Sequence, residues 1–246
     1  MKTIFISGMY RSGTTFLSKL INSNNQIECV SDPYAPIFKF LRNKLISKKR
    51  YNEYIKNSPL SDYYFDETEI KLFNQIQNLN LNIKIKKNEL YDLKQDIINH
   101  AKNYCPHLVS GIQNFKSRNI YDLINDSFEL INLYSNSKKQ YIGIKEVWVN
   151  EFVPTIIKSR KGSKILLVIR DPRSIVASNI YSNQRYPILF LCRQWRKLAS
   201  LAFLYKKKYK SVKIVKYENL IKNPNKELKK IFKFLKIKFD DQMLET

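Results

Sequence analysis

The chain has 246 residues, and its 44 Lys and Arg against 21 Asp and Glu give a formal net charge of +23 at pH 7. This length suits a single domain, and a hydrophobic content of 43% supports a core and excludes a wholly disordered chain. The three scattered cysteines argue against a disulfide framework and against a zinc site.

The sequence offers no segment suited to a membrane span, since no apolar run approaches the ~20 residues that a span requires. The stretch Ile4–Ile6 is too short for a signal peptide, so we expect a cytoplasmic protein. The net charge has two explanations: lysines spread over solvated surfaces, or an anionic ligand, membrane or nucleic acid. Arginine is the more specific clue, because its guanidinium binds anions through paired hydrogen bonds.

The first part of the chain has the order strand, loop, helix, strand. Thr3–Ser7 is β-like, Gly8–Gly13 forms a loop, Thr14–Ser23 has helical spacing, and Ile27–Val30 is a second short strand. Residues 34–140 then change character and become rich in Tyr, Asn and Lys, with apolar residues at helical spacing. We therefore expect a helical segment inserted between two stretches of alternating strands and helices.

The alternation returns after residue 140. Tyr141–Lys145 and Lys164–Ile169 are predicted as buried strands, each followed by a helix. A long helix is predicted from Pro187 to Tyr209, a strand over Val212–Tyr217, and a last helix that begins with Asn223 as its N-cap and Pro224 at its first position.

Strands separated by helices predict an α/β fold with three layers, in which a central parallel sheet is flanked by helices. We expect one domain over residues 1–246. Its α/β core would comprise about 1–33 and 141–240, with the helical insertion at about 34–140.

The loop after the first strand has the spacing G-x-x-x-x-G, from Gly8 to Gly13, and it leads into a helix. Backbone N–H groups at such a helix start bind phosphate. The lysine of the nucleotide-hydrolase version is replaced by Thr14, and Arg11 is placed to supply a cation instead. The alternative is an ordinary glycine-bearing turn between a strand and a helix.

The run R-S-G-T-T resembles the 5′-phosphosulfate loop of sulfotransferases that use 3′-phosphoadenosine 5′-phosphosulfate (PAPS). This resemblance implies a P-loop-like fold and a nucleotide-binding role for five residues. They are Arg11, Ser12, Gly13, Thr14 and Thr15.

A second stretch resembles the 3′-phosphate motif of the same family, in which a strand ends in Arg and a Ser follows eight residues later. Here these residues are Arg170 and Ser178. A guanidinium and a hydroxyl are suitable donors to a phosphate, although Arg170 and Asp171 could instead only cap a helix. Tyr217 resembles the tyrosine of a late strand that lies against the nucleotide.

The resemblance also implies catalytic roles for Arg11, Lys145 and Asp32. Lys145 matches the lysine near the transferring sulfuryl group, with a solvated strand-end lysine as the alternative. The cytosolic aryl type carries a histidine two residues later, where this chain has Val147. The chain therefore resembles the tyrosylprotein, carbohydrate and bacterial type more closely.

The base for the acceptor hydroxyl is expected to be Asp32, which aligns with the acid of the tyrosylprotein branch. Asp32 could alternatively be a turn residue before Pro33. Glu146 is the rival base, although it points to the opposite strand face from Lys145 if the strand continues. His100 and His107 are expected to be surface or helix-end histidines. No metal is expected, since Arg and Lys supply the positive charge.

The resemblance implies a sulfotransferase that moves a sulfuryl group from PAPS to a hydroxyl by in-line displacement and leaves 3′,5′-ADP (PAP). The acceptor would be a carbohydrate, lipid, metabolite or protein tyrosine, bound on the side of the insertion. No nucleic-acid partner is expected. The basic segment Lys206–Lys238 could touch a membrane, or its lysines could face water while its apolar residues pack on the sheet.

Two other functions stay open at this stage. A kinase could use the same glycine loop, although Thr14 stands where its lysine should be. A non-catalytic module that binds RNA or anionic lipid would explain the charge and leave the two anion motifs unexplained. The sequence does not indicate an oligomeric state.

Overall fold

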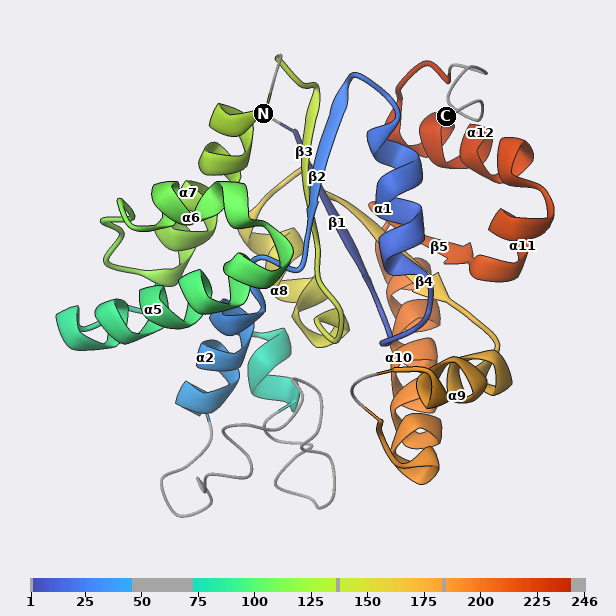
Figure 1. Cartoon of the computed structure of the whole chain (residues 1–246), viewed down its shortest axis with the longest axis horizontal. Helices are drawn as coiled ribbons and strands as arrows, with labels where there is room; N and C mark the ends of the chain where they lie inside the picture. The colour runs from blue at the N-terminus through green and yellow to red at the C-terminus, as the bar shows by residue number, and fades with distance from the viewer. Residues whose placement is uncertain (1, 46–72, 136–137, 183–184, 240–246) are drawn as a thin grey trace.

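A computed structural model describes residues 2–45, 73–135, 138–182 and 185–239 (Figure 1). Its described strands form one parallel sheet in the order β2-β3-β1-β4-β5. The strands are β1 (Lys2–Gly8), β2 (Ile27–Ser31), β3 (Tyr141–Lys145), β4 (Lys164–Ile169) and β5 (Val212–Lys216). The central position of β1 places the loop that follows it between the ends of β3 and β4.

Helices cover both faces of this sheet, as the α/β expectation requires (Figure 1). The helices are α1 (Thr14–Asn22), α2 (Ala35–Leu45), α5 (Lys87–Tyr104), α6 (Val109–Ile112), α7 (Ile120–Tyr134), α8 (Val153–Ser159), α9 (Pro172–Ile180), α10 (Ile188–Lys208), α11 (Tyr217–Lys222) and α12 (Pro224–Leu235). Two 3-10 turns lie at Pro106–Leu108 and Asn150–Phe152.

Alternate residues of β1 enter two separate hydrophobic clusters. Phe5 packs into the cluster that contains residues of α2, α5, α7, α8 and α10, whereas Ile4 and Ile6 pack into the cluster with α1 and α12. Successive side chains of a strand point to opposite faces, so the apolar run of β1 holds both outer layers. The three-layer prediction is confirmed.

The predicted insertion packs directly on the sheet in its described part. Phe128 of α7 meets Phe5 of β1 edge to face, with ring centroids 5.3 Å apart. Leu93, Ile97 and Ala101 of α5 are buried in the same cluster, as their helical spacing predicts. The part of the insertion at residues 46–72 lies outside the described residues.

Two predicted boundaries need correction. The strand β5 ends at Lys216, and Tyr217 begins α11 rather than ending the strand. The helix α1 ends at Asn22, with Ser23 as its C-cap. The predicted start of α12 is confirmed in position, although the Asn223 side chain makes no capping hydrogen bond.

The apolar stripe of α12 is buried against the sheet, since Leu228, Ile231, Phe232 and Leu235 are 0% exposed. Among the described helices, none combines the length and the apolar character needed to cross a bilayer.

Candidate active site

A cleft of about 680 Å³ lies at the carboxyl ends of β1, β2, β3 and β4. In open α/β sheets this edge is where ligands bind. The cleft wall includes eight of the ten predicted site residues. These are Arg11, Gly13, Thr14, Thr15, Asp32, Lys145, Arg170 and Ser178.

The loop after β1 is shaped by glycine. Gly13 has φ +93°, which L side chains rarely adopt, and a Cβ there would lie 2.2 Å from Cδ2 of Tyr217. With no side chain at this position, the chain turns directly into α1, whose first residues Thr14 and Thr15 line the cleft. The unpaired backbone N–H groups of this helix start give the cleft an anion-binding end.

The two predicted anion motifs meet at this end of the cleft. Nη1 of Arg170 donates to the backbone carbonyl of Arg11 at 2.9 Å, and Nε of Arg11 donates to Oγ of Ser178 at 2.8 Å. These bonds join the loop after β1 to β4 and α9. Nε of Arg170 is buried without a hydrogen-bond partner among the described residues, so the guanidinium keeps donor capacity.

Two of the predicted nucleotide residues lie outside the cleft wall. Tyr217 stands behind the loop, where its ring lies against Gly13 and its centroid is 4.4 Å from the Arg170 guanidinium carbon. Ser12 belongs to the loop itself, but it is buried rather than facing the cleft. The structure thus gives Tyr217 a supporting position, in which its ring holds the arginine and the glycine loop together.

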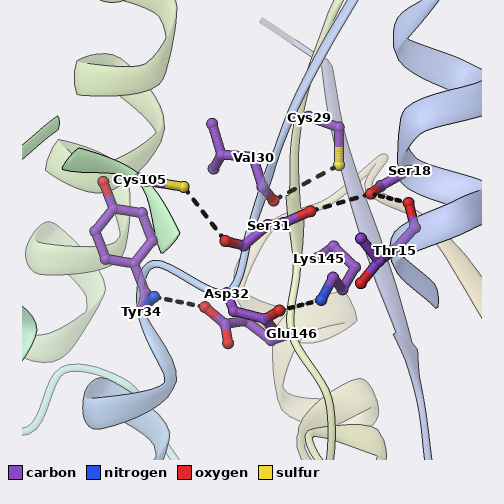
Figure 2. A network of polar contacts seen from close by, with 10 residues as sticks. All are labelled: Thr15, Ser18, Cys29, Val30, Ser31, Asp32, Tyr34, Cys105, Lys145 and Glu146. Carbon is purple, nitrogen blue, oxygen red and sulfur yellow. Dashed lines mark hydrogen bonds and ion pairs between the residues drawn. The ribbon is translucent and has the colours of Figure 1, made fainter. Parts of the chain in front are cut away.

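Lys145 and Asp32 form an ion pair at the ends of the neighbouring strands β3 and β2 (Figure 2). Lys145 is only 1% exposed, so it is no solvated strand-end lysine. The backbone N–H of Asp32 donates to the carbonyl of Lys145 at 2.7 Å, which fixes the two residues relative to each other. The second oxygen of Asp32, Oδ1, is buried without a hydrogen-bond partner among the described residues.

Glu146 is separated from the cleft and turns toward Tyr34 (Figure 2). Its Oε1 accepts a hydrogen bond from the backbone N–H of Tyr34 at 2.5 Å. Burial, together with the nearby carboxylate of Asp32, raises the pKa of Glu146 well above its ordinary value. This buried carboxyl group caps the turn that leads into α2.

His100 is a titratable residue of the cleft wall to which the sequence analysis assigned no catalytic role. It lies on α5, lines the cleft together with Asp32, and places its ring centroid 4.8 Å from that of Tyr104. Burial lowers the pKa of His100, while the Asp32 carboxylate opposes this shift. His100 is half-buried and lies four residues before the end of α5 (Lys87–Tyr104), whereas His107 is exposed.

Strained backbone is concentrated around the cleft. Arg11, Asp32 and Trp148 all have positive φ, at 63°, 56° and 69°, and all three line the cleft. Such conformations persist only where the surrounding structure holds them, and they gather at functional sites. Within the described ranges, no three or more His, Cys, Asp or Glu side chains come together as a metal-binding group.

Comparisons with known proteins identify the family of the chain and the fold that it shares. The model of the sulfotransferase family matches residues 3–241. A comparison with curated protein sequences gives no match.

Several solved sulfotransferase structures are similar in fold. The sulfotransferase domain of the Synechococcus PCC 7002 olefin synthase has a TM-score of 0.57 at 14% identity, over 99% of this chain and 76% of that chain. The sulfotransferase domain from the curacin biosynthetic pathway has a TM-score of 0.54 at 17% identity, over 99% of this chain and 76% of that chain. A sulfotransferase from Mycobacterium tuberculosis H37Rv has a TM-score of 0.54 at 14% identity, over 99% of this chain and 70% of that chain.

Proposed function

The chain belongs to the sulfotransferase family, and we propose that it transfers a sulfuryl group from PAPS to an acceptor hydroxyl by in-line displacement. Its fold is the P-loop-like α/β fold of that family, and its structural neighbours include bacterial sulfotransferases, in line with a non-cytosolic-aryl type. The donor, the acceptor and the roles of individual residues are parts of the proposal.

One observation carries the proposal: two anion-binding elements from distant parts of the chain meet in one cleft. The Arg11 loop and α1 would hold the 5′-phosphate, and Arg170 with Ser178 would hold the 3′-phosphate. The hydrogen bonds from Arg11 to Ser178 and from Arg170 to Arg11 support this division, since they hold both cations at one edge of the sheet. A bis-phosphorylated adenosine carries phosphates on the 3′ and 5′ oxygens of its ribose, and therefore suits such a pair of sites.

Sulfuryl transfer resembles phosphoryl transfer, in which the protein mainly positions the reactants and stabilises the developing charge. Lys145 is held at the strand ends by Asp32, and its ammonium would meet the negative charge that develops on the leaving oxygen. Asp32 would assist removal of the acceptor proton. The geometry favours Asp32 over Glu146, because Asp32 lines the cleft and Glu146 caps a buried turn.

The acceptor would enter from the helical insertion, whose residues His100, Asn103 and Tyr104 form one wall of the cleft. We propose a hydroxyl on a carbohydrate, lipid, metabolite or protein tyrosine.

The direct test is transfer of radiolabel from PAPS labelled at sulfur to a panel that holds one representative of each acceptor class. We expect label in at least one acceptor, and loss of that label in the Arg170→Lys variant. Transfer of label from γ-labelled ATP, with none from PAPS, would contradict the proposal.

A further inference from the structure

His100 stands where two hollows of the molecule meet. A second hollow of about 990 Å³ lies between α2 and α5, and it shares Lys39, His100 and Asn103 with the wall of the cleft. An acceptor that lies along α5 and presents a hydroxyl to Lys145 must therefore pass His100.

The imidazole of His100 has an unused nitrogen in this position. Its Nε2 is buried and has no hydrogen-bond partner among the described residues. Oδ1 of Asp32 is also buried and also lacks a hydrogen-bond partner among these residues. Buried polar atoms are nearly always paired, so two unpaired acceptors in one cleft wall need an explanation. A bound hydroxyl has one proton to donate, so it would give one of these two atoms a partner.

The other candidate base is already engaged. Oδ2 of Asp32 pairs with the Lys145 ammonium, so this oxygen is occupied by the ion pair. An imidazole titrates closer to neutral pH than a carboxylate does, which is the condition for efficient general base catalysis.

We propose that His100 takes the proton of the acceptor hydroxyl, while Asp32 stabilises the resulting imidazolium and holds Lys145. This inference rests on the proposed sulfuryl transfer and names the proton acceptor within it. The acceptor O–H bond breaks and its proton passes to Nε2, as the oxygen forms its bond to sulfur. The bond from sulfur to the 5′-phosphate oxygen breaks with its electron pair, next to the Lys145 ammonium.

The charged and titratable groups around His100 agree with this role. Asp32 favours the imidazolium through its carboxylate and through a hydrogen bond from the imidazole to its backbone carbonyl. Lys39 of α2 and Lys145 of β3 disfavour the imidazolium, and the Tyr104 ring packs against the imidazole. Burial lowers the pKa of His100, so the free imidazole is present at neutral pH. The activity should then fall as the pH is lowered through the pKa of His100.

The first test uses NMR, because the chain has only two histidines and each can be followed separately. The His107→Gln variant assigns the signals. We expect Asp32→Asn to lower the pKa of His100, since the carboxylate that favours the imidazolium is removed. An unchanged pKa would overturn the inference, because His100 would then not sense Asp32.

The second test is turnover with PAPS and the acceptor that the wild-type chain labels best. We expect His100→Gln to reduce kcat by about 10²- to 10⁴-fold, to remove the acid limb of the pH profile, and to leave stabilisation by PAP intact. Added imidazole should partly rescue His100→Ala. The exposed His107→Gln is the matched control and should keep wild-type turnover.

Two results would overturn the role of His100. One is a His100→Gln variant that keeps both its turnover and its acid limb. The other is a variant that loses PAP stabilisation together with turnover, which indicates a structural role. If PAP fails to stabilise the wild-type chain, the proposed function itself is wrong. This outcome concerns the wild-type chain, so it can be told apart from the two results for the His100→Gln variant.

Discussion

Nε of Arg11 donates a hydrogen bond to Oγ of Ser178 at 2.8 Å, and this bond joins the loop after β1 to the helix after β4. The two residues belong to the two anion motifs identified in the sequence. Their contact means that a ligand held by one motif is within reach of the other.

Arg170→Lys tests the proposed 3′-phosphate site. Lysine keeps the charge but loses the paired donors and the stacking on Tyr217. We expect the Kd for PAP, measured by calorimetry, to rise by about 10- to 100-fold, as for the loss of a charged hydrogen bond. Arg173→Lys is the control, because Arg173 is exposed and pairs with Asp171 outside the cleft. Equal weakening in both variants would contradict a specific role for the Arg170 guanidinium.

Gly13→Ala tests the shape of the phosphate loop. The new Cβ would meet the Tyr217 ring in a backbone conformation that already disfavours it. Gly162→Ala is a matched control, since Gly162 also has positive φ, at 89°, but has open space around it. Backbone strain alone costs about 1–3 kcal/mol. Urea unfolding should therefore show a larger loss of stability for Gly13→Ala than for Gly162→Ala, and only Gly13→Ala should lose PAP binding.

The variants Asp32→Asn and Glu146→Gln test which of the two carboxylates is needed for removal of the acceptor proton. We expect Asp32→Asn to keep PAP binding and to lose turnover by about 10²-fold or more, because it leaves Lys145 unpaired and removes the carboxylate. Glu146→Gln should keep turnover, since its amide oxygen can still accept from Tyr34. The kcat values of the two variants are the measurement. If Asp32→Asn keeps its activity and Glu146→Gln loses it, Glu146 rather than Asp32 is the carboxylate needed for turnover.

Glu146 also predicts how stability depends on pH. Its pKa is raised in the folded protein from an ordinary value of 4.5. The folded state therefore binds the proton more tightly than the unfolded state, and the contribution to stability is lost as the pH rises above about 4.5 toward the folded pKa. Urea midpoints should fall less steeply over this range for Glu146→Gln than for the wild-type chain. Parallel curves for the two proteins would contradict this.

The sequence predicted the sheet and its glycine loop because both are encoded locally. Strands buried on two faces are continuous apolar runs, as in β1 and β4, and the loop has a fixed spacing between Gly8 and Gly13. Tyr217 was misplaced by one element, since a strand end and a helix start cannot be separated by pattern at single-residue precision.

The position of His100 in the cleft wall could not be predicted, for a different reason. It lies in an amphipathic helix, and the spacing of the apolar residues in that helix does not predict which residues of other elements His100 faces. Its partner Asp32 is distant in sequence and reaches it only because α5 packs on α2 beside the end of β2. The same holds for the pairing of Lys145 with Asp32, which depends on the order of the strands in the sheet.

Ligand-induced thermal stabilisation most directly tests whether the cleft is built for a bis-phosphorylated adenosine. PAP, ATP with magnesium, and heparin are compared at matched ionic strength. At about 100 times its Kd, PAP without metal should stabilise the chain by about 2.7 kcal/mol, a rise in Tm of about 5–10 °C for a chain of this size. A preference for ATP with magnesium, or a response to heparin alone that fades with salt, would contradict the account.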